Sequence, residues 1–236
     1  MSIDLVANLR SKMKSFFRTI KKIVERFFGT KTDESFWRYR HLFDHKWTQK
    51  YIDWLSINQP HRQFVVEKIF NFSPFETVLE IGCASGPNLY LLAKKFPNTK
   101  FYGIDISKKA IETGRRYFKN KNIKNVFLSH ARADDLKSLP NQSIDIIFTD
   151  AVLVCIGPDK IKTVIKEIVR VARKAIILTE WHSEQPKSFS IDFWVHNYKL
   201  LFKDFFPEKQ IKFTKIPENL WQGGWIKYGY IIEIKI

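Results

Sequence analysis

Cysteine is scarce in this chain, which has only Cys83 and Cys155 in 236 residues. Two thiols at this spacing make neither a disulfide framework nor a zinc-ligand pattern, so we expect reduced thiols and no metal site. Long apolar runs are also missing, because no uninterrupted run approaches the roughly 20 residues that span a bilayer. The first residues lack the short apolar core and small-residue cleavage site of a secretory signal. These absences predict a cytoplasmic protein, with peripheral contact to a membrane left open.

Acidic residues are few compared with basic ones: 24 Asp and Glu stand against 40 Lys and Arg, a net charge of +16. Such an excess favours an anionic partner, which includes nucleic acid, an acidic membrane face and a phosphorylated substrate. An A/T-rich genome, which favours Lys codons, explains the same excess without a function, so both explanations stay open. The hydrophobic content of 44% is ordinary for a globular protein, and the length suits one domain with an extension.

The first 72 residues are predicted to form a helical extension. Apolar residues recur every three or four positions from Val6 to Phe28, with Lys and Arg between them, which is typical of a basic amphipathic helix over residues 1–30. Such a stripe packs on the protein itself, pairs with another helix or lies in an anionic membrane interface. Residues 33–72 are rich in aromatic side chains, which either bury against the next domain or line an acceptor pocket. Pro60 fits the first turn of a helix that runs to about Phe70.

From Thr77 onward, short β-rich runs alternate with helical stretches. Strands are expected at residues 77–81, 100–106, 125–130, 144–149 and 175–180. Helices are expected at residues 88–96, 108–119, 159–172 and 191–205. Near-continuous apolar strands with helical crossovers predict a parallel sheet that is covered on both faces, a doubly wound α/β fold over residues 73–236. The last two runs, 210–216 and 229–236, have no helix between them and are expected to pair antiparallel.

A glycine-rich turn follows the first predicted strand, in the sequence Val78-Leu-Glu-Ile-Gly82-Cys-Ala-Ser-Gly86-Pro-Asn88. Gly82 and Gly86 let the backbone turn tightly, and a helix that begins near Asn88 directs its N-terminus at the turn. A ligand can therefore approach main-chain N–H groups there. A nicotinamide-binding fold would have glycines in the pattern G-x-G-x-x-G, whereas here they are four apart and a carboxylate, Glu80, precedes the first.

The second predicted strand ends in the sequence Gly103-Ile-Asp105-Ile-Ser107. Asp105 is thus placed at the carboxyl end of a strand, the edge where α/β folds bind ligands. Its carboxylate can accept hydrogen bonds from both hydroxyls of a ribose, and Ile106 beside it can pack on a base. As a cap for the helix that follows, Ser107 is the better candidate.

Four segments of this chain, residues 80–86, 103–105, 143–148 and 167–171, resemble successive motifs of the class I S-adenosylmethionine-dependent methyltransferases. The resemblance implies a Rossmann-like, mostly parallel seven-stranded sheet with an antiparallel last strand, and S-adenosylmethionine across the strand ends. The middle glycine of the turn is Ala84 in this chain, and the acidic residue that meets the adenine falls near Arg132. The cofactor-binding residues that the resemblance implies are Glu80, Gly82, Cys83, Ala84, Gly86, Asn88, Asp105, Ile106 and, if the loop is shifted, Asp134 or its neighbour Asp135.

Candidate catalytic residues follow the fourth and fifth predicted strands, and they are Asp150, Glu180 and His182. Members of the family either deprotonate the acceptor with a positioned base or only align it with the sulfonium, since methyl transfer is an in-line displacement. Histidine ordinarily titrates near neutrality, as a base requires, and the alternative for His182 is a surface residue just past a strand. The alternatives for Asp150 are a partner for the ammonium group of the cofactor and a turn cap.

A third cluster consists of Trp221 and Trp225, which flank a Gly-Gly pair between the last two strands. Their rings are expected to stack on a sugar, base or lipid, or to pack on the aromatic extension. We therefore expect a methyltransferase that methylates O or N of a small or lipid-linked acceptor, with a saccharide among the candidates. The alternatives are an RNA or protein methyltransferase and a non-catalytic scaffold that binds S-adenosylmethionine.

Overall fold

The computed structural model describes residues 31–42, 44, 46–190 and 193–236. The amphipathic stripe predicted for residues 1–30 lies outside these described residues. The helical elements are α2 (Lys31–Tyr39), η1 (Arg40–Leu42), α3 (Trp47–Lys50), α4 (Trp54–Ile57), α5 (Pro60–Phe70), α6 (Pro87–Lys95), α7 (Lys108–Asn120), η2 (Leu153–Cys155), α8 (Ile161–Val171), α9 (Tyr198–Phe202), η3 (Glu208–Gln210) and α10 (Gly224–Tyr228). The strands are β1 (Thr77–Ile81), β2 (Lys100–Asp105), β3 (Val126–His130), β4 (Ile144–Asp150), β5 (Ala172–Trp181), β6 (Lys187–Ser190), β7 (Phe193–Val195), β8 (Ile211–Lys215) and β9 (Gly229–Lys235).

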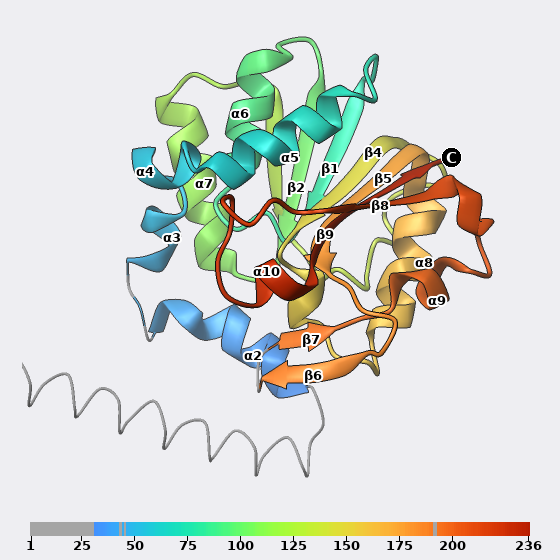
Figure 1. Ribbon diagram of the computed structural model, residues 1–236. Helices are drawn as coiled ribbons and strands as arrows, with labels where there is room; N and C mark the ends of the chain where they lie inside the picture. Colours follow the sequence, from blue (N-terminus) through green and yellow to red (C-terminus); the bar gives the residue numbers. More distant parts are fainter. Residues whose placement is uncertain (1–30, 43, 45, 191–192) are drawn as a thin grey trace, which may run out of the picture.

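Seven strands form one sheet in the order β3-β2-β1-β4-β5-β9-β8 (Figure 1). Strands β1 to β5 are parallel, whereas β9 runs antiparallel to both β5 and β8. This topology confirms the predicted doubly wound α/β fold with an antiparallel last strand. Because β1 pairs with β2 on one side and with β4 on the other, the direction of strand succession reverses there. Open α/β sheets bind ligands at the carboxyl ends of the strands beside such a reversal.

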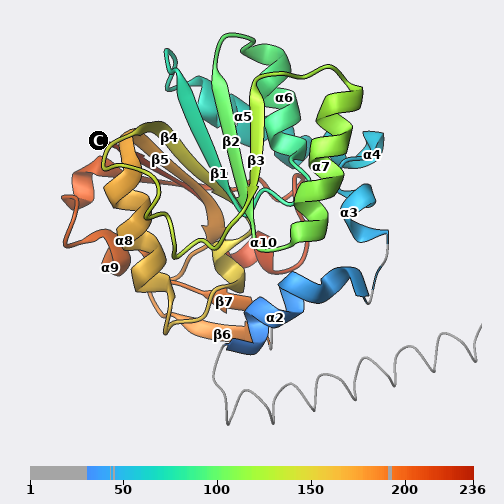
Figure 2. The same cartoon turned by 180° about the vertical axis from the view of Figure 1, so that it is seen from behind.

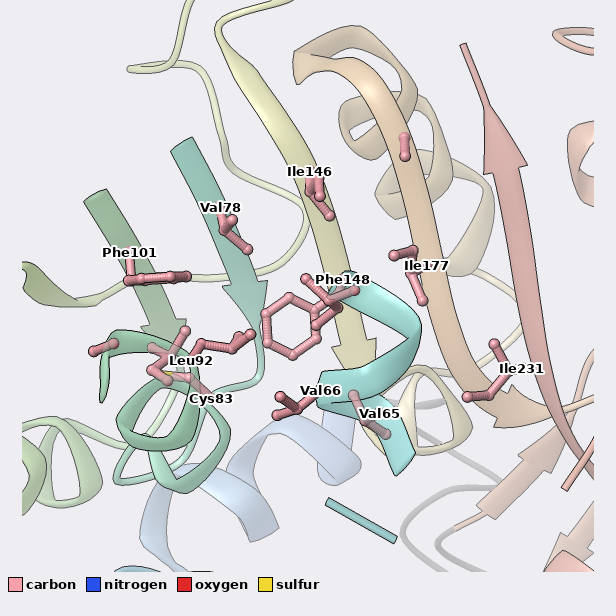
Figure 3. Packing of buried hydrophobic residues seen from close by; sticks show 14 of the residues in the cluster. Val65, Val66, Val78, Cys83, Leu92, Phe101, Ile146, Phe148, Ile177 and Ile231 are labelled. Atoms are coloured by element: carbon pink, nitrogen blue, oxygen red, sulfur yellow. The ribbon is translucent and has the colours of Figure 1, made fainter. Parts of the chain in front are cut away.

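Helices cover both faces of this sheet, with α5, α6 and α7 on one face and α8 and α9 on the other (Figures 1 and 2). Side chains alternate along β1, where Val78 packs in the cluster under α5 to α7 and Leu79 packs in the cluster under α8. Figure 3 shows Val65 and Val66 of α5 packed toward Phe148 of β4. The last helix of the N-terminal extension is therefore part of the main core.

The helix predicted for residues 191–205 is wrong in its first part. Residues 187–190 and 193–195 pair as the antiparallel hairpin of β6 and β7, and the helix α9 begins only at Tyr198. Its N-cap is Asn197, whose side chain accepts a hydrogen bond from the amide of Leu200. The run Phe193-Trp-Val195 consists of aromatic and β-branched residues, which prefer a strand, and this preference prevails over the helical spacing of the apolar residues.

The segment from α2 to α4, called the lid from here on, lies across the carboxyl edge of the sheet. Trp47 of the lid packs against Ala84 in the turn after β1 and against Ala110 of α7. The carbonyl of Thr48 accepts a hydrogen bond from the hydroxyl of Ser85 at 2.7 Å. These contacts place the lid directly over the end of the sheet where ligands are expected. Among the residues that the structure describes, no helix is both long and apolar enough to cross a membrane.

Candidate active site

A cavity of about 600 Å³ lies between the carboxyl edge of the sheet and the lid. The sheet side is formed by the turn between β1 and α6 and by the residues that end β2 and β4. The opposite wall comes from the lid and α5, and it includes Trp47, Tyr51 and Arg62. Of the residues assigned to the cofactor by resemblance, all but Gly86 and the alternative Asp135 line this cavity. Gly86 instead starts α6 in a left-handed conformation, with φ of 84°.

The turn after β1 requires unusual backbone conformations. Gly82 has φ of +74°, and a Cβ built on it would lie 2.2 Å from Cγ2 of Val152, so only glycine fits there. Ala84 also has a positive φ, 49°, a conformation that costs a residue with a side chain roughly 1–2 kcal/mol. The amides of Gly82 and Cys83 both donate to the carbonyl of Ile104, at 2.8 and 2.9 Å. The turn is thereby fixed against the end of β2.

The carboxylate of Asp105 is oriented by two backbone amides. Ala84 donates to Oδ2 at 2.9 Å, and Ser107 donates to Oδ1 at 2.7 Å. Each oxygen therefore has one lone pair engaged and one remaining for a ligand. Burial raises the pKa of Asp105, an effect that these two hydrogen bonds oppose. Ser107, as expected, caps α7 by accepting from the amide of Ala110.

The side chain of Asn88 joins two carboxylates at the cavity. Its Nδ2 donates to Oε1 of Glu80 at 2.7 Å and to Oδ2 of Asp150 at 2.9 Å. Arg62 of α5 donates from Nη1 to Oδ1 of Asn88 at 3.0 Å and to Oδ2 of Asp150 at 3.4 Å. All four side chains are buried. Burial, together with the nearby carboxylates of Asp150 and Asp105, raises the pKa of Glu80 to about 8.

Asp134 lines the cavity beyond the end of β3. Arg132 donates to its two oxygens from Nε at 2.8 Å and from Nη2 at 2.7 Å, and this pairing lowers the pKa of Asp134. The same guanidinium donates from Nη1 to Glu34 of α2 at 2.6 Å, and Lys160 also bonds to Glu34. Arg132, which replaces the acidic residue of the family pattern, thus holds Asp134 on one side and the lid on the other. Asp135 does not line the cavity.

The structure does not bring His182 to the cavity. Its ring packs against Phe213 and Tyr230, with centroid separations of 4.5 and 5.4 Å. Its Nδ1 accepts a hydrogen bond from the amide of Tyr198 at 3.2 Å. Burial lowers the pKa of His182 to about 4. His182 is buried and does not line the cavity, so the structure does not support a general base at this position.

Glu180 also lies outside the cavity and is fully buried. Its carboxylate accepts the hydroxyl of Thr149 at 2.7 Å and the consecutive amides of Val152, Leu153 and Val154 at 3.0–3.1 Å. Burial raises the pKa of Glu180 to about 7, although these four donors oppose the shift. The side chain therefore holds the loop after β4 in place from behind, and of the three catalytic candidates only Asp150 lines the cavity.

Comparison with known proteins identifies the family. The methyltransferase-domain family model matches residues 78–175. A ribosomal RNA small subunit methyltransferase G from Flavobacterium psychrophilum is 30% identical over 173 residues, which cover 70% of this chain and 78% of that protein. This chain belongs to the class I S-adenosylmethionine-dependent methyltransferases. Members of this family bind S-adenosylmethionine and transfer its methyl group to an acceptor.

Two further similarities concern one curated relative and one solved structure. Human tRNA N(3)-cytidine methyltransferase METTL6 is 29% identical over 143 residues, which cover 58% of this chain and 46% of that protein. This methyltransferase spans between 15 and 46% of the length of four of the curated relatives that it matches, METTL6 among them. In fold it resembles magnesium protoporphyrin IX methyltransferase (ChlM) from Synechocystis PCC 6803 with bound SAM. The TM-score is 0.61 at 17% identity, with 86% of this chain and 96% of that chain covered.

The buried atoms of the methyltransferase cavity fit this cofactor. Oε2 of Glu80, Oδ1 of Asp150 and the indole Nε1 of Trp47 are buried, and among the described residues none of the three has a hydrogen-bond partner. Native proteins leave few such atoms, and a bound ligand or water commonly supplies the partner. The methionine end of S-adenosylmethionine has an ammonium group, which donates, and a carboxylate, which accepts. Oε2 of Glu80 and Nε1 of Trp47 match these groups, Asp105 matches the ribose hydroxyls, and Oδ1 of Asp150 remains as a further acceptor.

Sequence reasoning missed two residues that the methyltransferase places at its cavity, Arg62 and Trp47. Neither belongs to a motif, and the only signal was the aromatic character of the extension that contains them. Trp221, which was expected to stack on a ligand or on the extension, lines the cavity and stacks on Trp225 at 3.8 Å and on His61 of α5 at 4.2 Å. The loop between β8 and β9 therefore contacts the extension next to the cavity.

Proposed function

We propose that this methyltransferase methylates an oxygen or nitrogen of a small or lipid-linked acceptor, with a saccharide as one candidate. The enclosure of the cavity carries this proposal. A volume of about 600 Å³ lies within the range of small-molecule sites, roughly 300–1,000 Å³. The lid covers one side of it, so the reacting group must be small enough to enter beside the cofactor. A lipid carrier would remain outside.

One wall of the cavity, formed by the lid, α5 and the loop between β8 and β9, has the character of an acceptor site. His61 and Trp221 stack on one another there, and Tyr51 and Arg62 are close neighbours that also line the cavity. Aromatic side chains pack on the apolar parts of sugar rings, and buried charged groups form hydrogen bonds with hydroxyls. A ring with several hydroxyl groups therefore matches this wall better than a purely apolar acceptor does.

Within this proposal, Asp150 accepts the proton that the acceptor loses. Asn88 and Arg62 both bind Oδ2 of Asp150, which leaves the buried Oδ1 for a ligand. S-adenosylmethionine supplies an activated methyl group when bound. The chain's own contribution is then to align the acceptor with that methyl group and to remove one proton, two effects that are typical of enzymes with positioned carboxylates.

The test is a transfer assay with labelled S-adenosylmethionine and cell extract separated into small molecules, lipids, RNA and protein. We expect label in the small-molecule or lipid fraction, stable to ribonuclease and protease. The same fraction incubated with the Asp150→Asn variant is the control for enzyme-dependent labelling. Label that appears only in ribonuclease-sensitive material would contradict the proposal.

RNA is the second candidate acceptor. Two observations favour it: several relatives are named as ribosomal RNA or tRNA methyltransferases, and the chain has a net charge of +16. Because the lid covers the cavity, a base within an RNA helix would have to be extruded from its stack to reach Asp150. Ribonuclease sensitivity in the same assay separates the two candidates.

A further inference from the structure

The positive charge of this methyltransferase is concentrated in one stretch. Residues 94–124 contain ten Lys and Arg but only two Asp and Glu, a net charge of +8 that is half of the +16 of the whole chain. They form the end of α6, β2, α7 and the loop that leads to β3. An A/T-rich genome would distribute lysine over the whole chain, so codon usage does not explain this concentration.

The cations of this stretch also lack carboxylate partners among the described residues. Within the described ranges, none of the ten forms an ion pair, whereas cations elsewhere do: Arg173 and Lys174 of β5 with Asp145, and Arg170 of α8 with Glu167. Helix α7 buries its apolar residues against the sheet and leaves most of its basic ones exposed. The α6–α7 face (residues 94–124) is therefore an uncompensated positive surface.

An exposed leucine lies beside this face. Leu55 of α4 is 78% exposed, more than any other large apolar side chain that the structure describes, and it also lines the cavity. Helix α4 packs against α6, and Thr48 of α3 bonds to Thr113 of α7 at 3.2 Å. Both views place α3, α4 and α7 along one side of the molecule (Figures 1 and 2). The α6–α7 face thus lies beside one exposed apolar side chain, Leu55, at the cavity.

We infer that the α6–α7 face and Leu55 together bind an anionic membrane. Lysine and arginine are attracted to anionic headgroups, and an adjacent leucine buries in the acyl-chain boundary. RNA phosphates would attract the same cations, but they give no reason for a water-exposed leucine beside them. This inference rests on the proposed function in one respect, the reason for membrane binding. A lipid-linked acceptor in the same membrane would meet the cavity at Leu55.

The experiment is flotation of the full chain with vesicles of phosphatidylcholine, with or without phosphatidylglycerol. The test variant combines three substitutions, Arg116→Glu, Lys119→Glu and Lys121→Glu. All three positions are exposed and lie in the second half of α7 or just after it. We expect wild-type protein to float only with the anionic vesicles. The variant should bind the anionic vesicles at least about tenfold more weakly, because three positive charges that attract anionic headgroups become negative charges that repel them. Leu55→Ser should lower vesicle binding without lowering the affinity for an RNA oligonucleotide.

The matched control changes the same number of charges elsewhere, with Lys137→Glu, Lys162→Glu and Lys166→Glu on the α8 side. Both variants keep residues 1–30, so a difference between them reports the α6–α7 face. Equal loss of binding in the two variants would show attraction by net charge alone and overturn the inference. Binding of RNA that depends on α7, without binding of vesicles, would overturn it as well. The assay contains no acceptor, so its outcome is independent of the proposed reaction.

Discussion

Nδ1 of His182 accepts a hydrogen bond from the backbone amide of Tyr198, 3.2 Å away. The ring supports the start of α9 and stays neutral, because burial lowers the pKa of His182 to about 4. His182→Ala removes a buried ring and leaves an amide unsatisfied. We therefore expect a loss of about 2–4 kcal/mol in the free energy of unfolding.

Below the melting temperature of the variant, its rate of methyl transfer should match that of the wild type. Denaturant unfolding and single-turnover transfer assays measure the two quantities separately. A hundredfold slower transfer in a variant of unchanged stability would instead restore His182 as a base.

Asp105 lines the cavity and His182 does not, and this contrast shows which site residues can be predicted from the sequence. The turn after β1 and the end of β2 are local strand–turn–helix signals, so the residues that line the cavity there follow from sequence alone. The same reasoning predicts Glu180 and His182 as catalytic residues, because they lie at the end of β5 and just after it. Whether a side chain at that position points to the cavity depends on β9 and α9, which come later in the chain and pack around His182.

Arg62 illustrates the remaining gap. Its guanidinium reaches Asp150 across 88 positions of sequence, and no local pattern around Arg62 indicates this contact. The hairpin of β6 and β7 is a smaller case, because an apolar run that suits both a helix and a strand is decided by its tertiary neighbours.

Asp105 is proposed to bind the ribose of the cofactor. Asp105→Ala should weaken the binding of S-adenosylmethionine by about 1.5–3 kcal/mol, because charge-assisted hydrogen bonds are lost. It should also lower the melting temperature, since the amides of Ala84 and Ser107 lose their acceptor. Asp105→Asn, which keeps one acceptor oxygen, should show a smaller loss of both. Calorimetry that found tight binding of NAD and none of S-adenosylmethionine would contradict the assignment.

Trp47 is proposed to donate its indole N–H to the carboxylate of the cofactor. Trp47→Phe keeps an aromatic ring against Ala84 but removes the donor and part of the ring, so we expect binding weaker by about 1–3 kcal/mol. The stability of the cofactor-free protein should fall only by the packing lost with the smaller ring, because this N–H has no partner among the described residues. Trp194→Phe is the matched control, since Nε1 of Trp194 is also buried without a described partner but does not line the cavity. Equal losses of affinity in both variants would refute the contact.

Asp150 is proposed as the proton acceptor. Asp150→Asn preserves the size of the side chain but removes its basicity, and it should lower turnover by about 10²–10⁴-fold. The affinity for S-adenosylmethionine should change far less. Calorimetry and transfer assays on the same labelled fraction measure both. Lost affinity with unchanged turnover would assign Asp150 to the ammonium group of the cofactor instead.

Glu80 couples cofactor binding to pH. Its pKa of about 8 in the folded protein exceeds the ordinary 4.5, because the carboxyl is buried beside the carboxylates of Asp150 and Asp105. The unfolded chain therefore loses this proton first, and the stability that the group contributes is present below about pH 4.5 and lost as the pH rises toward 8. A cation bound next to Glu80 favours the ionised carboxylate, so binding of S-adenosylmethionine near neutral pH should release a proton.

The affinity for S-adenosylmethionine should accordingly rise with pH by up to about tenfold per unit, and level off once Glu80 is ionised in the free enzyme. Glu80→Gln has no proton to release and still offers an acceptor to Asn88, so its affinity should be weaker and nearly independent of pH. The amino group of the cofactor titrates alike in both proteins, and the difference between them isolates Glu80. Calorimetry in two buffers of different ionisation enthalpy counts the released protons directly. If wild type and Glu80→Gln release the same number near neutral pH, Glu80 is not the coupled group.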